Sequence, residues 1–89
     1  MNGVESELVA QIFGRIVKSL RKGTTGLTQE ALAEKTDTDR TYPSLLENGQ
    51  RCPTLWVVIR YARALGIEPD LLVKMVMLKF KSKSKSKIR

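Results

Sequence analysis

Apolar residues recur at helical spacing along most of the chain. In residues 5–22, two neighbouring rows of apolar side chains repeat every four positions: Leu8, Ile12, Ile16 and Leu20, with Val9, Phe13 and Val17 beside them. This spacing predicts a helix with a broad apolar face, and residues 55–65 repeat it. No segment has the alternation typical of a strand. The sequence therefore predicts an all-α fold, a compact domain of five helices.

Capping residues separate the predicted helices. Glycine tolerates positive φ, so Gly49 and Gly66 are expected to end helices, and a loop is expected over residues 23–27. A fifth helix is expected from residue 69 to about residue 80, with Pro69 in its first turn. Three polar residues stand where a side-chain oxygen would accept a bond from a free amide of the next turn: Thr28, Asp39 and Thr54.

The positive charge of the chain is concentrated at its end. The formal net charge is +7, but residues 79–89 hold 6 of the 16 basic residues and none of the 9 acids. Residues 1–78 therefore carry only +1. We expect a folded domain over residues 1–78 and a basic, disordered tail over residues 79–89, which alternates Lys and Ser. The tail is either a solvated segment or an arm that lies along phosphates.

Composition excludes several kinds of chemistry. The chain has no histidine and a single cysteine, Cys52, which removes the Ser-His-Asp triad, His ligation and thiolate-only metal sites. We therefore expect no enzymatic activity, no cofactor and no metal. One cysteine cannot form an internal disulfide, which favours a reducing, cytoplasmic compartment. No apolar stretch approaches the roughly 20 residues that span a bilayer, so no membrane partner is expected.

The segment from Leu27 to Leu55 carries the functional prediction. Residues 28–48 are expected to form two short helices joined by a tight turn, and a loop that ends near a proline follows them. A helix-turn-helix of this kind places its second helix in the major groove of double-stranded DNA. We expect that recognition helix to run from about Arg40 to Glu47.

Several short motifs occur together in a fixed order: Phe13-Gly14, Arg21, Leu27-Thr28-Gln29, Leu32-Ala33, Glu47-Asn48-Gly49, Arg51 with Pro53, and Ala62-Arg63-Ala64-Leu65-Gly66. With these motifs the chain resembles the lambda-repressor-like (Cro/Xre) helix-turn-helix family over residues 13 to about 72. The run from Asp39 to Tyr42 is also similar to the recognition helix of restriction-modification controller proteins, a dimeric branch of that family. The resemblance implies a DNA-binding regulator of transcription.

The expected DNA contacts lie on and around the recognition helix. Arg40 is the main candidate for reading sequence, because its planar fork matches guanine O6 and N7. For Leu45 the alternative is a core position, and for Tyr42 it is packing against the preceding helix. The expected base-reading residues are Arg40, Thr41, Ser44 and Leu45. The expected phosphate or mixed contacts are Thr28, Gln29, Tyr42, Asn48 and Arg51.

Two predictions concern contacts between protein groups. Arg21 and Glu47 resemble the internal ion pair of the family; the alternative is two separately solvated charges. Large apolar residues at positions that are generally polar suggest a two-fold dimer interface made by Trp56, Val57, Met75, Val76, Met77 and Leu78. The alternative is that the first turns of the N-terminal helix, including Leu8 and Ile12, cover this surface.

Three residues depart from the family pattern. Asp37 stands where glycine is usual in the turn, and Thr38 replaces an apolar residue, which would weaken the local core. Pro43 falls inside the expected recognition helix, where proline costs a backbone bond. The helix either tolerates Pro43 in its first turn or begins later, with Arg40 and Thr41 on a more extended approach.

The sequence predicts a transcriptional regulator that binds a pseudo-palindromic operator as a homodimer. Two alternatives on the same fold remain open. One is an antitoxin-type autoregulator whose apolar surface binds a toxin. The other is a protein-interaction module that has lost DNA binding, which Pro43 and the nearly neutral body would favour.

Overall fold

The predicted all-α fold is confirmed. The computed structural model describes residues 3–88, with only the backbone described for residues 84–88. No strand occurs in this part of the chain, and no helix in it is long and apolar enough to cross a membrane. The elements are α1 (Gly3–Leu20), the wider helical turn η1 (Arg21–Thr25), α2 (Gln29–Thr36), α3 (Tyr42–Glu47), α4 (Leu55–Leu65) and α5 (Pro69–Ile88).

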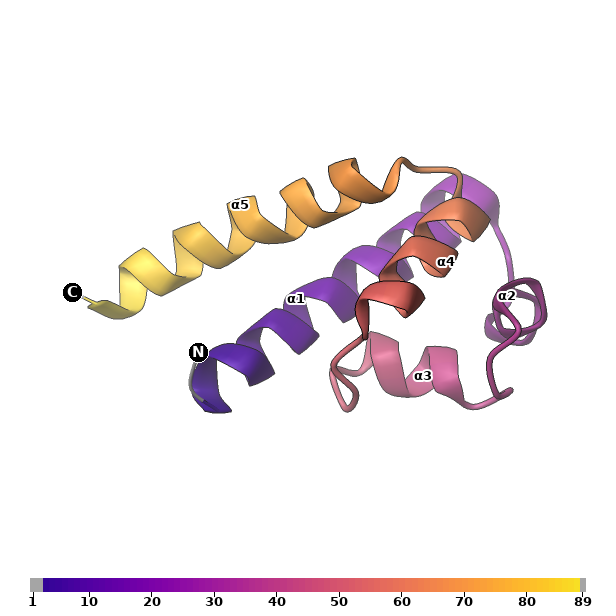
Figure 1. Cartoon of the computed structure of the whole chain (residues 1–89), viewed down its shortest axis with the longest axis horizontal. Helices are drawn as coiled ribbons and strands as arrows, with labels where there is room; N and C mark the ends of the chain where they lie inside the picture. Colours follow the sequence, from indigo (N-terminus) through magenta and orange to yellow (C-terminus); the bar gives the residue numbers. More distant parts are fainter. Residues whose placement is uncertain (1–2, 89) are drawn as a thin grey trace.

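The long helix α1 organises the domain. It packs against α3 on one side and against α5 on the other, while α4 lies beside it and contacts α2 and α5 (Figure 1). The apolar rows of α1 supply Ile12, Phe13 and Val17 to a core that all five α-helices share. The other members of this core are Leu32, Leu46, Tyr61, Ala62, Leu65, Leu72 and Val76.

Gly14 allows α1 to lie close to the end of α3. A Cβ atom at this position would collide with the backbone carbonyl oxygens of Leu46 and Glu47. Because the obstacles are backbone atoms, a larger side chain could be accepted only if the two helices moved apart. The spacing between α1 and α3 therefore depends on this one glycine.

Three of the predicted helix ends are confirmed. The Thr28 hydroxyl accepts a hydrogen bond from the Ala31 amide at 3.0 Å, and the Thr54 hydroxyl accepts one from the Val57 amide at 3.2 Å. Gly66 ends α4 in the left-handed conformation, with φ of 75°. Local hydrogen-bonding chemistry thus sets the starts of α2 and α4 before any tertiary packing.

The prediction of a loop over residues 23–27 is wrong for most of this range. The helix continues from α1 through η1 with the wider π-type hydrogen-bonding pattern and stops at Gly26, with φ of 69°. The Thr25 hydroxyl donates to the Arg21 carbonyl at 2.8 Å and accepts from the Leu27 amide at 3.1 Å. A π-turn accommodates one residue more than an α-turn, and the backbone remains helical in this form up to Thr25.

Residues 79–88, which the sequence places in a disordered tail, are helical in the structure. In the structure α5 does not end near Phe80 but continues as helix to Ile88. Lysine has a good helix propensity and serine a tolerable one, so an alternating Lys-Ser run can extend a helix that is already nucleated. Residues 79–88 of the basic segment therefore belong to α5.

The apolar surface predicted for a dimer is partly covered within the chain. Val76 is only 8% exposed and belongs to the core, which corrects its assignment to an interface. Ile12 is buried and Leu8 packs against the same core, so the alternative in which α1 covers this surface holds in part. Met77 and Leu78 remain 41% and 61% exposed.

Candidate nucleic-acid interface

A left-handed residue forms the turn after α2. Asp37 has φ of 55° and ψ of 43°, and the Thr38 amide donates to the Ala33 carbonyl at 3.0 Å. Aspartate adopts this conformation at lower cost than most residues other than glycine. The turn therefore keeps its geometry although glycine, usual at this position in similar sequences, is absent.

Thr38 replaces an apolar contact with a polar one. Its hydroxyl is 2.9 Å from the Thr36 hydroxyl and 2.9 Å from the Tyr61 hydroxyl. Tyr61 is fully buried, and burial raises the pKa of its phenol, which keeps the hydroxyl protonated and able to donate. The weakening of the core expected at Thr38 is thus offset by a satisfied network that links the turn to α4.

The recognition helix begins two residues later than expected. In the structure α3 begins at Tyr42. The start expected at about Arg40 is therefore wrong, and the alternative in which the helix begins later is confirmed. Pro43 occupies the second helical position, where no intrahelical bond is lost, and its side chain is fully buried. Arg40 and Thr41 consequently lie in the turn that leads into α3.

Asp39 organises this leading turn instead of capping the helix directly. Its carboxylate accepts from the Thr41 hydroxyl at 2.6 Å and from the Thr41 amide at 3.0 Å, and its carbonyl accepts from the Tyr42 amide at 2.9 Å. The bonds from Thr41, the hydroxyl's foremost, lower the pKa of the Asp39 carboxyl below 3.8. The stabilisation that these hydrogen bonds give to the folded state is present above the pKa that Asp39 has in the unfolded chain. It is lost as the pH falls through the lower pKa that Asp39 has in the folded state. The hydrogen bonds from Thr41 to the Asp39 carboxylate therefore stabilise the turn at neutral pH.

The four candidate base-reading residues are accessible to different degrees. Arg40 and Thr41 are exposed, while Ser44 and Leu45 are half-buried. The neighbouring Leu46 is completely buried. Leu46 is therefore the core residue of this pair, and part of Leu45 stays on the surface.

Tyr42 packs against α4. Its ring meets that of Tyr61 edge to face, with centroids 6.3 Å apart. Partial burial raises the pKa of the Tyr42 phenol, so its hydroxyl remains a neutral donor at physiological pH. This contact fixes the first residue of α3 against the core.

The predicted ion pair between Arg21 and Glu47 is formed. The Nε and Nη2 atoms of Arg21 donate to the two carboxylate oxygens of Glu47 at 2.6 and 3.0 Å, and both residues are over 90% buried. These hydrogen bonds raise the pKa of the Arg21 guanidinium. Arg21 Nη1 also donates to the Leu27 carbonyl at 2.9 Å. The network joins η1, the start of α2 and the end of α3.

Gln29 belongs to this network as well. Its side-chain amide donates to Glu47 Oε1 at 3.0 Å, a contact that the sequence analysis missed. The side chain expected on a phosphate is thus engaged inside the protein. Three other residues expected near phosphates are exposed: Thr28, Asn48 and Arg51.

Trp56 lies on the side of α4 that faces α2. The Arg60 guanidinium is 4.8 Å from the centre of the indole ring, and Arg60 Nη1 donates to the Thr36 carbonyl at 2.7 Å. Trp56 lines a shallow hollow with the end of α2, including Lys35. None of the α5 residues that were expected in the dimer interface lines this hollow.

Exposed apolar residues not assigned in the sequence analysis extend the apolar surface of α4 and α5. Leu55 is 73% exposed and Leu71 is 48% exposed. Leu71 precedes Leu78 by seven residues, or two helical turns, which places both on one flank of α5. That spacing was visible in the sequence and could have pointed to this flank. Val57, by contrast, is half-buried and packs against the core.

Comparison with known proteins identifies the family. The sequence pattern of the Helix-turn-helix family matches residues 17–72, which include α2, the turn and α3. The chain belongs to the helix-turn-helix family of Cro/C1 type. It is therefore a DNA-binding transcriptional regulator by family, and the family is not one of enzymes.

Two curated relatives are control proteins. Control protein C.MunI from Mycoplasma sp is 46% identical over 55 residues, which cover 62% of this chain and 74% of the relative. Control protein C.BamHI from Bacillus amyloliquefaciens is 39% identical over 62 residues, which cover 68% and 76%. These matches extend the family resemblance to the branch suggested by residues 39–42.

Two solved structures that are similar to this one are those of a controller protein and of a gene regulator. The crystal structure of the restriction-modification controller protein C.AhdI from Aeromonas hydrophila matches with a TM-score of 0.66 and 40% identity, over 71% of this chain and 94% of that chain. The clp gene regulator ClgR from Corynebacterium glutamicum matches with a TM-score of 0.75 over 89% and 83% of the two chains. At 20% identity the second match concerns the fold alone.

Proposed function

We propose that this helix-turn-helix protein regulates transcription by binding a pseudo-palindromic operator as a homodimer, with α3 in the major groove. One observation carries the proposal: Asp39 holds the turn that presents Arg40 and Thr41 at the start of α3. Both presented side chains are exposed. The N-terminal residues of a recognition helix are those that reach base edges.

The residues around α3 fit a DNA backbone on both sides. Thr28 is exposed at the start of α2, where free amides favour an anion, and Asn48 and Arg51 are exposed after α3. Contacts of this kind set the register of the protein on DNA, while Arg40 would distinguish bases. We assign phosphate contacts to these three residues and a mixed role to Tyr42.

The genes controlled are proposed from the relatives. C.MunI and C.BamHI are named control proteins, and C.AhdI is a restriction-modification controller protein that matches this chain over 94% of its own length. We infer that this chain controls genes of a restriction-modification system. We infer a cytoplasmic location, because the regulator has to meet its operator on chromosomal or plasmid DNA.

A homodimer is proposed from the apolar residues that the fold leaves outside. Leu71 and Leu78 are exposed on one flank of α5, Met77 is exposed on the same helix, and Leu55 is exposed on α4. Their burial against a second copy would remove apolar surface from water. A two-fold dimer would place two recognition helices about 34 Å apart, one turn of DNA.

Pro43 no longer supports the alternative in which the fold has lost DNA binding. It lies in the first turn of α3, where it is compatible with helix, and it fills a buried position. The helix is therefore regular from Tyr42 to Glu47.

The proposed function is tested by selecting bound sequences from a pool of random double-stranded DNA. We expect a pseudo-palindromic motif to be enriched, because each half-site is read by one copy of α3. Failure to enrich any motif would contradict sequence-specific regulation. Enrichment of a motif without symmetry would retain DNA binding but contradict the proposed dimer.

A further inference from the structure

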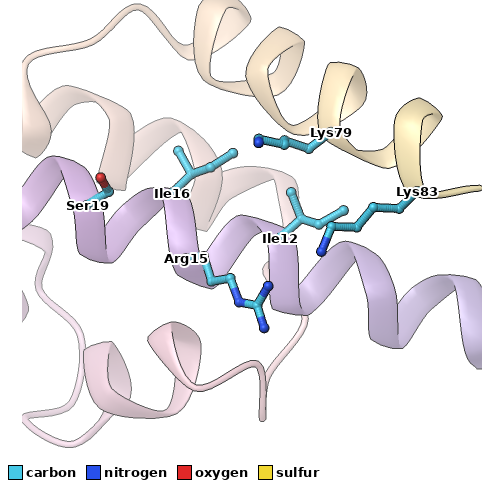
Figure 2. Close-up of a pocket in the computed structure, with 6 residues that line it drawn as sticks. All are labelled: Ile12, Arg15, Ile16, Ser19, Lys79 and Lys83. Atoms are coloured by element: carbon cyan, nitrogen blue, oxygen red, sulfur yellow. The ribbon is translucent and has the colours of Figure 1, made fainter.

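A groove lies between α1 and the C-terminal half of α5. Its apolar floor is formed by Ile12 and Ile16, which are four residues apart on α1. Lys79 and Lys83, also four apart, extend from α5 toward these isoleucines (Figure 2). Arg15 and Ser19 complete the rim. The groove therefore combines a short aliphatic strip with three cationic side chains.

The charge of the groove is one-sided. Among the described residues that line it, none is acidic. Lys79, Lys83 and Arg15 are all exposed, so their charges are available to an incoming anionic group. Ile12 is 3% exposed and Ile16 is half-buried, so Ile16 presents most of the accessible aliphatic surface of the floor.

The position of the groove separates it from the recognition helix. α5 packs on one side of α1 and α3 on the other (Figure 1). DNA held by α3 therefore lies on the side of α1 away from Lys79 and Lys83. These cations are free for a different anionic partner while the protein is bound to its operator.

The size of the groove favours side chains over a complete small molecule. Its volume is about 280 Å³. Pockets for drug-sized ligands hold about 300–1,000 Å³ and enclose most of the ligand, whereas this groove is open along its length. A helix laid in such a groove inserts apolar residues at three- and four-residue spacing and keeps its polar residues at the rim.

We propose that this groove is a docking site for an acidic amphipathic helix of a partner protein. An aliphatic side chain of that helix would pack on Ile16, above the buried Ile12. Carboxylates one turn apart on the same helix would pair with Lys79 and Lys83, which have matching spacing. The regulator would thus hold a protein partner on the face opposite to its DNA.

The test measures fluorescence anisotropy of a labelled peptide with Glu and Leu at helical spacing, titrated with the full chain. The variant Lys79→Glu/Lys83→Glu reverses the groove charges. The matched control Lys74→Glu/Lys81→Glu makes the same change at exposed lysines of α5 that do not line the groove. Glutamate and lysine have similar helix propensities, so both variants are expected to retain α5.

We expect the groove variant to bind the peptide at least about tenfold more weakly, and the control variant to lose no more than about twofold. A scrambled peptide of the same composition should bind wild-type protein at least about fivefold more weakly, because it lacks the aliphatic strip. Both variants should bind the selected operator like wild type.

Four results would overturn the proposal. They are no peptide binding up to about 1 mM wild-type protein, equal losses for the two variants, and equal binding of the scrambled peptide. The fourth is loss of operator binding or of self-association in the groove variant alone, which would assign the groove to phosphates or to a second copy. The selection of operator DNA by the wild-type protein tests the proposed function separately, and its outcome does not depend on any of these four results.

Discussion

At the level of single residues, Arg21 links three parts of the structure. Its guanidinium bonds to Glu47 at the end of α3 and to the Leu27 carbonyl before α2. A buried pair of this kind adds little net stability compared with an apolar pair, but loss of one partner leaves a buried charge uncompensated. Its main role is to fix how α3 sits against α1.

Arg21→Ala is expected to lower the free energy of unfolding by about 3–5 kcal/mol, because Glu47 remains buried without its partner. Arg21→Lys should lose less, since it keeps the charge but not the two-pronged geometry. Chemical denaturation monitored by circular dichroism measures both. The neighbouring exposed Lys22→Ala serves as control, with a change within about 0.5 kcal/mol. Equal effects of the two alanine variants would refute a structural role for the pair.

Arg40 is the residue on which sequence reading depends in the proposed function. Arg40→Ala is expected to weaken binding to the selected operator by about 1–3 kcal/mol, roughly 5- to 150-fold. Stability should not change, because Arg40 is exposed. The control Arg63→Ala removes the same charge from α4, and anisotropy of labelled operator DNA compares the two. A loss no greater than that of Arg63→Ala would show that Arg40 contributes charge only.

Several residue roles were accessible from the sequence and others were not. Thr28 and Thr54 were predicted as caps because the cap depends on local chemistry, and the Arg21–Glu47 pair followed from the resemblance. The bond from Gln29 to Glu47 and the Thr38–Tyr61 contact were missed, since a long-range polar contact depends on packing geometry. The residues assigned to DNA contacts remain predictions.

At the scale of elements, the helices were predicted better than their ends. Periodicity identifies a helix from many residues together, whereas an end depends on one or two. The start of α3 was placed too early because Asp39 bonds to Thr41 and shapes a turn before the helix. The end of α5 was placed too early because a repetitive Lys-Ser run indicates disorder by composition, although its residues are compatible with helix.

Two glycines in the same helical stretch test the packing of α1 against α3. Gly14→Ala is expected to destabilise the fold by at least about 1–3 kcal/mol, because the added Cβ meets the backbone of α3. Gly23→Ala, in η1, meets nothing within 4 Å and is expected to stabilise by about 0.4–1 kcal/mol. Thermal unfolding of the two variants measures the difference. A stable Gly14→Ala protein would contradict the close approach of α1 and α3.

At the scale of the whole molecule, α1 separates two surfaces with different expected uses. α3 and its flanking turns lie on one side, and the basic groove of α1 and α5 lies on the other (Figure 1). The +7 charge of the chain comes mostly from residues 79–89, and residues 79–88 belong to α5 and not to the recognition helix. Whole-chain charge is therefore a poor guide to the DNA-binding surface of this protein.

Self-association is expected to depend on the exposed flank of α5. Leu78→Glu places a charge where apolar surface would be buried, and we expect the dimer dissociation constant to rise at least about tenfold. Lys81→Glu, at an equally exposed position on α5, should have a smaller effect. Analytical ultracentrifugation over a range of concentrations measures both. A wild-type protein that stays monomeric at the highest concentration would contradict the dimer.

The measurement that tests the central claim most directly is methylation protection of guanine N7 on the selected operator. N7 lies in the major groove, where α3 and Arg40 are proposed to bind. We expect two symmetric groups of protected guanines about 10 base pairs apart, one for each copy of α3. Guanine N7 atoms that stay fully reactive in the saturated complex, or a single protected group, would contradict a dimer that reads the major groove through α3.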